Sequence, residues 1–219
     1  MHMDTAYSMI EATSFLAGMR GDFPPKTALQ IAEVMMTEGI PIFEFTMNSV
    51  EPIEAMKAVK KEYGDEACVG MGTVLNTEQA ARVIDAGADM IIAPSFNPDV
   101  VNRAHEAGIL AVPGVLTPTE IVNAWDLGVK ILKIFPIGSL GLGYFKSVRG
   151  PLDHVKFMCN GGMTDENSAD FLRAGAVCCG MANWLTGDGH TSLDVLRGRA
   201  RKLKSIADEV RTGKKAQRI

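Results

Sequence analysis

The sequence lacks an excess of positive charge, a large share of aromatic residues and any long apolar run. Its 219 residues carry 22 Lys and Arg against 26 Asp and Glu, for a formal net charge of −4, and 6% are aromatic. This balance gives no support for attraction to nucleic acid or to an anionic membrane surface. No apolar run reaches the roughly 18 residues of a membrane span, and the N-terminal segment has no apolar core typical of a signal peptide. We therefore expect a cytoplasmic protein whose partners are small molecules or proteins.

The residue patterns of metal, disulfide and acyl-transfer sites are also missing. The four cysteines show no C-x-x-C spacing, and the adjacent Cys178 and Cys179 would point to opposite faces of a strand. The four histidines form no H-x-x-x-H pair, and no Gly-x-Ser-x-Gly motif is present. The sequence predicts reduced thiols and neither a metal site nor an organic cofactor.

Hydrophobic residues, 47% of the chain, form short runs of strand length that alternate with segments of helical period. Eight strands are predicted, at residues 15–20, 42–46, 68–72, 90–94, 110–112, 131–135, 155–160 and 177–180. Helices with clear start and stop signals are predicted at residues 26–38, 78–86, 99–107, 120–127 and 166–174. This rhythm predicts a (β/α)8 TIM barrel. An open doubly wound sheet is the alternative, and it is disfavoured because no G-x-G-x-x-G follows the first strand.

The segments outside this alternation complete a single domain of residues 1–219, with the barrel at about residues 15–185. Residues 5–13 predict a helix that caps the barrel floor. Residues 192–210 predict an amphipathic C-terminal helix, and residues 211–219 a basic tail. A nucleic-acid arm is one interpretation of this basic end. A solvated helix face is favoured because aromatic residues are absent there.

Polar residues inside strands are the first candidates for chemistry, because a barrel of this type places its active site at the carboxyl ends of its strands. Lys133 interrupts an apolar strand, and period-two alternation puts it on one face with Ile131 and Phe135. If that face is inward, desolvation favours the neutral amine, a nucleophile that forms Schiff bases with carbonyl compounds. The alternative is that Lys133 pairs with an inward carboxylate and fills the interior.

Glu44 is the candidate carboxylate. Alternation in the second strand places Glu44 with Thr46 on one face, and Phe43 with Phe45 on the other. We expect the aromatic face to pack against helices. An inward glutamate can move protons to and from an imine and the adjacent carbon, directly or through water. A simple ion pair with Lys133 is compatible with this role.

Weaker candidates follow other strands. Thr73 follows the third strand, and Arg20, which closes the first, is either a carboxylate or phosphate ligand or a surface residue. Loops after the last two strands are a common phosphate site in this architecture, and they contain Gly161, Gly162 and Gly180. Two tight turns would need the same glycines for conformational reasons alone.

A set of motifs spans nearly the whole predicted barrel in a familiar order and spacing. They are Glu44-Phe45-Thr46-Met47-Asn48-Ser49, Gly72-Thr73-Val74-Leu75, Ala93-Pro94-Ser95, Pro113-Gly114, Thr117-Pro118-Thr119-Glu120, Leu132-Lys133-Ile134-Phe135-Pro136 and Gly161-Gly162. Together they resemble the 2-keto-3-deoxy-6-phosphogluconate / 4-hydroxy-2-oxoglutarate aldolase family. The resemblance implies a class I aldolase, usually a homotrimer, that needs no cofactor. Such an enzyme cleaves a 2-keto-3-deoxy sugar acid to pyruvate and an aldehyde, either glyceraldehyde 3-phosphate or glyoxylate.

The resemblance also implies roles for individual residues. Lys133 would form the imine, and Glu44 would be the general acid and base. The remaining implied site residues lie along the substrate: Thr73 at the pyruvyl carboxylate, Pro94 and Phe135 beside the imine, and Gly161, Gly162 and Gly180 at the distal phosphate.

Two positions depart from the gluconate-type pattern. Asn48 stands where many such members have an arginine, which resembles the galactonate-type branch that uses an arginine at the first strand, here Arg20. Ala182-Asn183 replaces a glycine-serine pair, so a hydroxyl is missing beside the expected phosphate and Asn183 is its substitute.

Two functions of other classes would share parts of this sequence. A phosphate-barrel isomerase or epimerase would have the glycine loops but would not need a lysine inside a strand. A non-catalytic sugar-acid binding barrel would keep the pocket without the reaction. Trapping of a covalent adduct distinguishes the aldolase from both.

Overall fold

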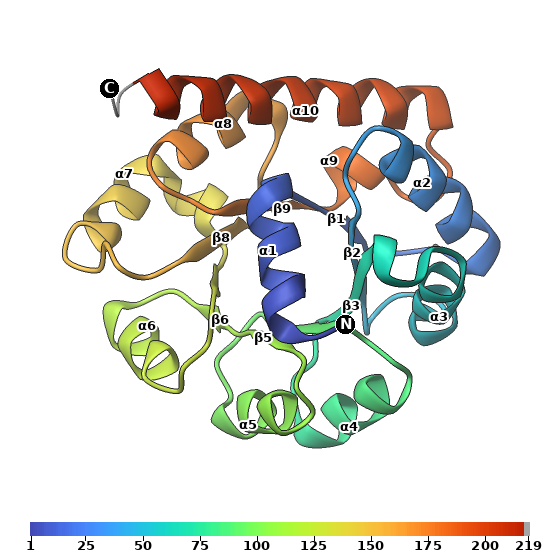
Figure 1. Cartoon of the computed structure of the whole chain (residues 1–219), viewed down its shortest axis with the longest axis horizontal. Helices are drawn as coiled ribbons and strands as arrows, with labels where there is room; N and C mark the ends of the chain where they lie inside the picture. The colour runs from blue at the N-terminus through green and yellow to red at the C-terminus, as the bar shows by residue number, and fades with distance from the viewer. Residues whose placement is uncertain (217–219) are drawn as a thin grey trace.

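Parallel strands form a nearly closed barrel at the centre of the molecule (Figure 1). The computed structural model describes residues 1–216. Its strands are β1 (Phe15–Met19), β2 (Ile42–Thr46), β3 (Cys68–Gly72), β4 (Met90–Ile92), β5 (Leu110–Val112), β6 (Gly114–Val115), β7 (Leu132–Ile134), β8 (Phe157–Asn160) and β9 (Cys178–Met181). The order around the sheet is β5-β4-β3-β2-β1-β9-β8-β7-β6. The predicted TIM-barrel fold is confirmed.

The number of strands differs from the prediction, because the fifth strand is divided at Pro113. β5 pairs with β4, whereas β6, just beyond Pro113, pairs with β7. Proline has no backbone N–H to donate to a ladder, so the two short strands cannot continue as one. Gly114 is needed at this point, since a Cβ there would lie 2.3 Å from the carbonyl carbon of Pro94. The described barrel therefore has nine strand segments at eight strand positions, because β5 and β6 together occupy the position of the predicted fifth strand.

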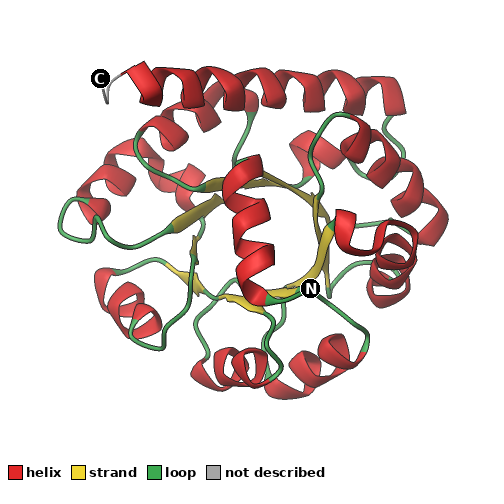
Figure 2. Cartoon of the chain, viewed as in Figure 1, coloured by secondary structure: helices red, strands yellow, loops and turns green. Residues whose placement is uncertain are grey.

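Helices surround the barrel on its outside (Figure 2). The covering helices are α2 (Pro25–Thr37), α3 (Pro52–Tyr63), α4 (Thr77–Asp85), α5 (Pro98–Glu106), α6 (Pro118–Trp125), α7 (Ile137–Arg149), α8 (Asp165–Arg173) and the short α9 (Asn183–Thr186), with a 3-10 turn at Gly64–Glu66. α1 (Met3–Thr13) crosses the barrel opening that faces the viewer in Figure 1. This is the end where strands begin, so α1 caps the floor as predicted.

The C-terminal helix is longer than the prediction. α10 (Leu193–Ala216) continues through most of the expected basic tail, because Lys, Arg and Ala are good helix formers; residues 217–219 of that tail lie outside the described residues. α10 lies along α8 and α2 (Figure 1). Arg201 and Arg197 donate hydrogen bonds to Glu38 at the end of α2, and they hold the pKa of its carboxyl below the usual range.

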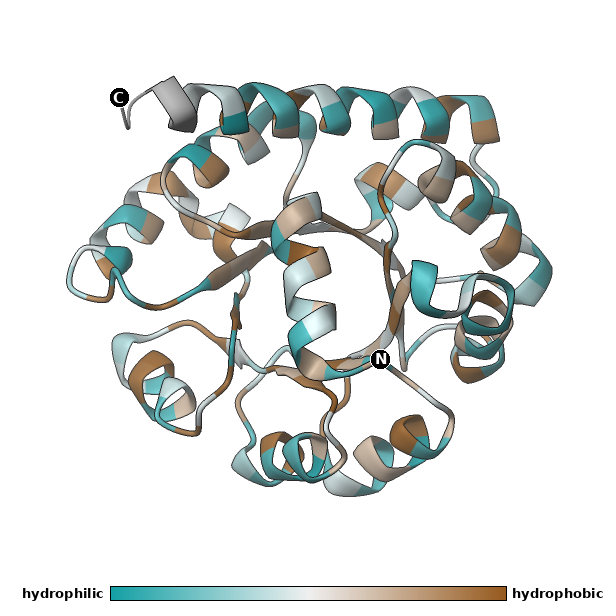
Figure 3. Cartoon of the chain, in the orientation of Figure 1, coloured by the Kyte–Doolittle hydropathy of each residue, from teal (hydrophilic) through white to brown (hydrophobic). Residues whose placement is uncertain are grey.

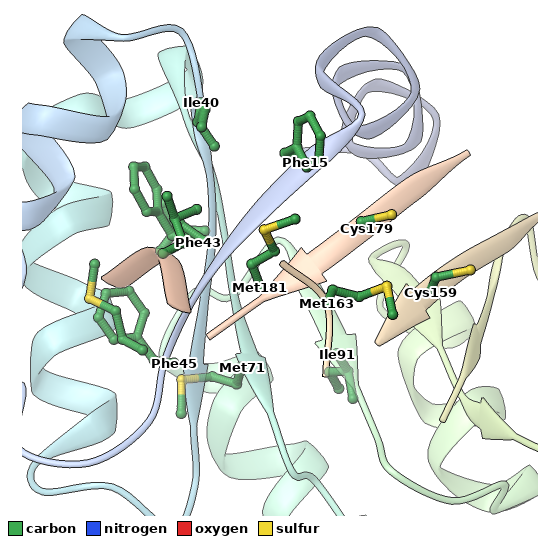
Figure 4. Close-up of a cluster of buried hydrophobic side chains, with 14 of the residues drawn as sticks. Phe15, Ile40, Phe43, Phe45, Met71, Ile91, Cys159, Met163, Cys179 and Met181 are labelled. Carbon is green, nitrogen blue, oxygen red and sulfur yellow. The ribbon is translucent and has the colours of Figure 1, made fainter. Parts of the chain in front are cut away.

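The strands have two apolar faces that belong to different cores. Outward side chains such as Phe43, Phe45 and Cys179 pack under the helices, as the alternation predicts (Figure 4). Inward side chains such as Ile42, Met90 and Cys178 fill the lower half of the barrel together with Ile10 and Ala6 of α1. Figure 3 shows polar residues concentrated on the outer helix faces. The lower interior of the barrel is therefore filled with side chains.

The four cysteines are free and buried, as expected for reduced thiols. Burial raises the pKa of the Cys68 and Cys179 thiols to about 12. Because the thiolate is the reactive form, these side chains behave as small apolar groups.

Candidate active site

A cavity of about 370 Å³ opens at the carboxyl ends of the strands, and we call it the Lys133 cavity. It brings together eight of the predicted site residues: Arg20, Glu44, Lys133, Phe135, Gly161, Gly162, Gly180 and Asn183. The other lining residues are Thr46, Asn160, Met163, Thr164, Met181, Ala182 and Trp184. A larger hollow of about 750 Å³ lies outside the barrel between α3 and α4 and contains neither Lys133 nor Glu44.

Lys133 and Glu44 face each other inside this cavity. They are 2% and 4% exposed, and the Nζ of Lys133 lies 3.8 Å from Oε1 of Glu44. That separation is too long for a direct hydrogen bond, and Oε1 has no hydrogen-bond partner among the described residues. The Nζ also lies 5.1 Å from the centre of the Phe135 ring, within the range of a cation–π contact. The pair is close enough for a small group or a water to bridge it.

Glycines on neighbouring strands leave room for the polar side chains. A Cβ on Gly72 of β3 would lie 2.0 Å from Oε1 of Glu44, and a Cβ on Gly18 of β1 would lie 3.4 Å from Oε2. Gly72 also pairs with Thr46 in the ladder between β2 and β3. Any side chain at Gly72 would therefore displace the carboxylate. The position of the Glu44 carboxylate therefore depends on β3, which carries Gly72, as well as on β2.

Asn160 is a site residue that the sequence did not single out. It ends β8, is 6% exposed and lines the cavity. Its amide lies against Gly180, where a Cβ would be 2.2 Å from Nδ2. The Oδ1 atom is buried and has no described hydrogen-bond partner. The signal that identified Lys133, a polar residue at the carboxyl end of an apolar strand, applies equally to Asn160.

The wide end of the cavity is built from backbone. Gly161 and Gly162 both have positive φ, at 86° and 78°, which turns the chain sharply after β8. The N–H groups of Gly162 and Met163 donate to no described residue. The side chain of Thr164 then caps the N-terminus of α8 in a capping box with Asn167. Unpaired N–H groups beside a helix N-terminus form a site suited to an anion.

Asn183 and Trp184 on α9 form another part of this wall. Arg199 of α10 stacks on the Trp184 ring, with its Cζ 5.8 Å from the ring centre. Trp184 is thus held from outside by the C-terminal helix, which lies beyond the barrel itself.

Two predicted site residues, Thr73 and Pro94, are not among those lining the cavity. Thr73 follows Gly72 at the carboxyl end of β3 and has a φ of +60°, a strained conformation for a β-branched residue. Pro94 follows β4, and its backbone contacts Gly114. Both residues lie at the correct end of the barrel.

No group of three or more His, Cys, Asp or Glu side chains arranged to hold a metal ion occurs in the part of the chain that the structure describes. Among the same residues, no helix combines the length and apolar character needed to span a membrane.

Comparison with known proteins gives one consistent match. The model of the family "KDPG and KHG aldolase" matches residues 24–195. The KHG/KDPG aldolase of Escherichia coli (strain K12) is 33% identical over 159 residues, which cover 72% of this chain and 74% of the relative. The 2-dehydro-3-deoxy-6-phosphogalactonate aldolase of the same organism is 32% identical over 169 residues, 77% of this chain and 82% of the relative.

A solved structure described as native KDPGal structure superposes with a TM-score of 0.85 at 29% identity, covering 90% of this chain and 96% of that one. The family match extends over the strands that carry Glu44 and Lys133. The chain therefore belongs to the KDPG and KHG aldolase family and is a lyase of the aldolase type.

Proposed function

We propose that this aldolase acts through a Schiff base on Lys133 and cleaves a 2-keto-3-deoxy-6-phospho sugar acid. The observation that carries the proposal is the buried pair of Lys133 and Glu44, 3.8 Å apart at the base of one cavity. The amine of a lysine is the nucleophile that adds to a ketone when a Schiff base forms.

The reaction begins when Nζ of Lys133 adds to C2 of the keto acid. Loss of water from the carbinolamine gives a protonated imine. The C4 hydroxyl then loses its proton and the C3–C4 bond breaks, so that the aldehyde leaves and the bonding electrons move into an enamine. Protonation at C3 and addition of water to the imine release pyruvate and restore the lysine. The protonated imine is the electron sink of the reaction.

Glu44 would move the protons in this sequence. Its Oε1 faces Nζ without a hydrogen-bond partner among the described residues, so it is available to a substrate hydroxyl or a bridging water. General acid–base catalysis requires contact at hydrogen-bond distance, or through one water. The carbinolamine hydroxyl, formed at C2 beside Nζ, falls within that reach.

The far end of the substrate would carry a phosphate or a carboxylate. Supporting groups are the free N–H groups of Gly162 and Met163, the N-terminus of α8 and the Arg20 side chain at the rim. A guanidinium can form two parallel hydrogen bonds to such an anion. We infer a phosphorylated substrate because the backbone groups supply donors without a serine hydroxyl.

Borohydride reduction in the presence of pyruvate tests the imine directly. We expect one lysine to gain a carboxyethyl group, because Lys133 is the buried lysine of the Lys133 cavity. Mass spectrometry of proteolytic peptides identifies the modified residue. Modification of a different lysine, or none, would overturn the mechanism and leave the isomerase and binding-protein alternatives.

Asn183→Ser tests the distal phosphate. The substitution adds a hydroxyl at the wall of the wide end, and a hydrogen bond to a charged group contributes roughly 1.5 to 3 kcal/mol. We expect kcat/KM for a 6-phosphorylated 2-keto-3-deoxy acid to rise about ten-fold. Cleavage of 4-hydroxy-2-oxoglutarate, which has no phosphate, serves as the control and should stay nearly constant. If the native enzyme prefers the unphosphorylated acid and the substitution changes neither rate, the phosphate assignment is wrong.

A further inference from the structure

A second cavity, of about 590 Å³, lies at the opposite end of the barrel, and we call it the Arg149 cavity. Its walls come from segments that precede strands and from the helices beside them. Its lining includes Glu11, Arg149, Lys156, Gly175, Val177 and Arg211. α1, whose last residue Thr13 accepts a hydrogen bond from Arg211 of α10, crosses the same end of the barrel, which faces the viewer in Figure 1. The packed lower interior of the barrel separates it from Lys133.

Basic side chains from three elements converge on this cavity. Arg149 ends α7, Lys156 precedes β8, and Arg211 belongs to α10. Arg211 is held in place, since it donates to the carbonyl of Thr13 at 3.2 Å and pairs with Asp208. The one acidic residue of the lining is Glu11, whose carboxylate accepts a hydrogen bond from the hydroxyl of Tyr7.

Arg149 and Lys156 have no such partners within the described part of the chain. Neither forms an ion pair there, and the Nε of Arg149 is a buried donor without an acceptor. A buried donor left unpaired destabilises the fold by the desolvation of its N–H, so an acceptor from outside the chain is favoured at this position. The guanidinium lies flat against Gly175, where a Cβ would be 2.4 Å from its Cζ.

A purely structural role for Arg149 would be to bind the last carbonyl groups of α8, which ends near Gly175. No hydrogen bond from Arg149 to those carbonyls is found among the described residues. The turn is closed by backbone groups instead, with the N–H of Gly175 bonded to Leu172 and that of Ala176 to Phe171. The guanidinium is therefore free to bind a ligand.

We propose that the Arg149 cavity binds a small organic phosphate, at a site separate from the Lys133 cavity. Two cations without a partner among the described residues favour a ligand with two negative charges, and a phosphate monoester carries close to two near neutral pH. The planar guanidinium offers two parallel N–H groups to such an anion. The apolar walls at Leu172, Val177 and Val210 face the carbon skeleton of the ligand. The cavity volume lies within the range of small-molecule sites.

Isothermal titration of the full chain with glycerol 3-phosphate tests this assignment, with glycerol as the uncharged control. Lys156→Gln and Arg149→Gln each remove one cation, and each should weaken this binding about ten-fold or more. Lys156 is exposed, so its substitution disturbs no packing and keeps the test valid if Arg149→Gln folds poorly. Thermal unfolding curves verify that both variants are folded.

Arg20→Gln is the matched control, because it weakens the phosphate site proposed in the Lys133 cavity, to which glycerol 3-phosphate should also bind, and so identifies which of the two binding events belongs to the Arg149 cavity. It should leave glycerol 3-phosphate binding at the Arg149 cavity unchanged. Aldolase turnover measured without added phosphate should be the same in Lys156→Gln as in the native enzyme, so the outcome does not depend on the proposed Schiff base. Equal affinity in the native protein and both cavity variants, or loss of binding in Arg20→Gln alone, would refute the second site.

Discussion

Replacing Lys133 with methionine should reduce kcat on the order of 10⁴-fold or more, because covalent catalysis loses its nucleophile and no second amine lines the cavity. Methionine is close to lysine in length and fills the same space between Phe135 and Glu44. The measurement is the single-turnover rate of cleavage of the 6-phosphorylated keto acid, monitored by the pyruvate that is released.

Lys130→Met is the matched control for this variant. Lys130 precedes the same strand but pairs with Asp4 near the barrel floor. Its substitution should leave kcat unchanged. Thermal unfolding of Lys133→Met distinguishes lost chemistry from a lost fold, since it leaves the buried Glu44 without its nearest cation. Turnover within ten-fold of the native rate in a folded Lys133→Met protein would contradict the Schiff base.

Glu44→Gln should lower kcat by about 10² to 10⁴-fold, the usual contribution of a general acid–base group. Glutamine occupies the same space beside Gly72 but cannot accept and return a proton. Because Lys133 remains, borohydride with pyruvate should still label it, but more slowly. The rate of labelling and kcat should therefore both fall while the labelled residue stays the same.

Glu38→Gln is the matched control for Glu44→Gln, because it makes the same change at a glutamate on the outside of the barrel. There the change removes the negative charge that pairs with Arg197 and Arg201 and leaves one of the two acceptor oxygens. A small drop in melting temperature with native kcat is the expected result. If Glu44→Gln kept native kcat, the proton-transfer role would pass to water or to another group.

Period-two alternation predicted the orientation of the two central side chains because strand geometry fixes it locally. Lys133 and Glu44 lie on the inward faces of β7 and β2, and Phe43 and Phe45 lie outside them. The distance between β7 and β2 could not be predicted in the same way. It depends on the order and tilt of the strands, which pair with neighbours far away in sequence. The expectation that both side chains face inward at the carboxyl ends of their strands related them to one site, and the family resemblance agreed, but neither predicted their separation.

The helices that the sequence did not predict have weak local signals. α7 contains Gly138, Gly141 and Gly143, and its backbone departs from helical geometry at Gly141. Glycine lowers helix propensity, so tertiary packing of Phe145 against Phe157 and Phe171 stabilises this segment instead. α3 begins after Glu51, which has a positive φ and no capping side chain. Pro52 at the first position of α3 is nevertheless a start signal that the sequence contains, whereas α7 begins without a capping side chain.

Asn160 shows a second reason why the sequence does not predict every residue of the site. Its sequence position fits a site residue, but its amide could have pointed to a neighbouring carbonyl group. Only the contact with Gly180 on β9 determines where the amide lies. The same is true of Thr73 and Pro94, whose strands end at the right level of the barrel although neither residue lines the cavity.

The packed floor of the barrel has a consequence for the order of events during turnover. Ile42, Met90 and Ile10 of α1 fill the interior below Lys133, and the Lys133 cavity opens at the carboxyl ends of the strands. In the proposed mechanism a three-carbon acid bound to Lys133 lies deepest, with the rest of the substrate between it and solvent. The aldehyde must then depart before the keto acid does. In the synthetic direction, the keto acid must bind first, so the kinetics follow a compulsory order that the shape of the fold imposes.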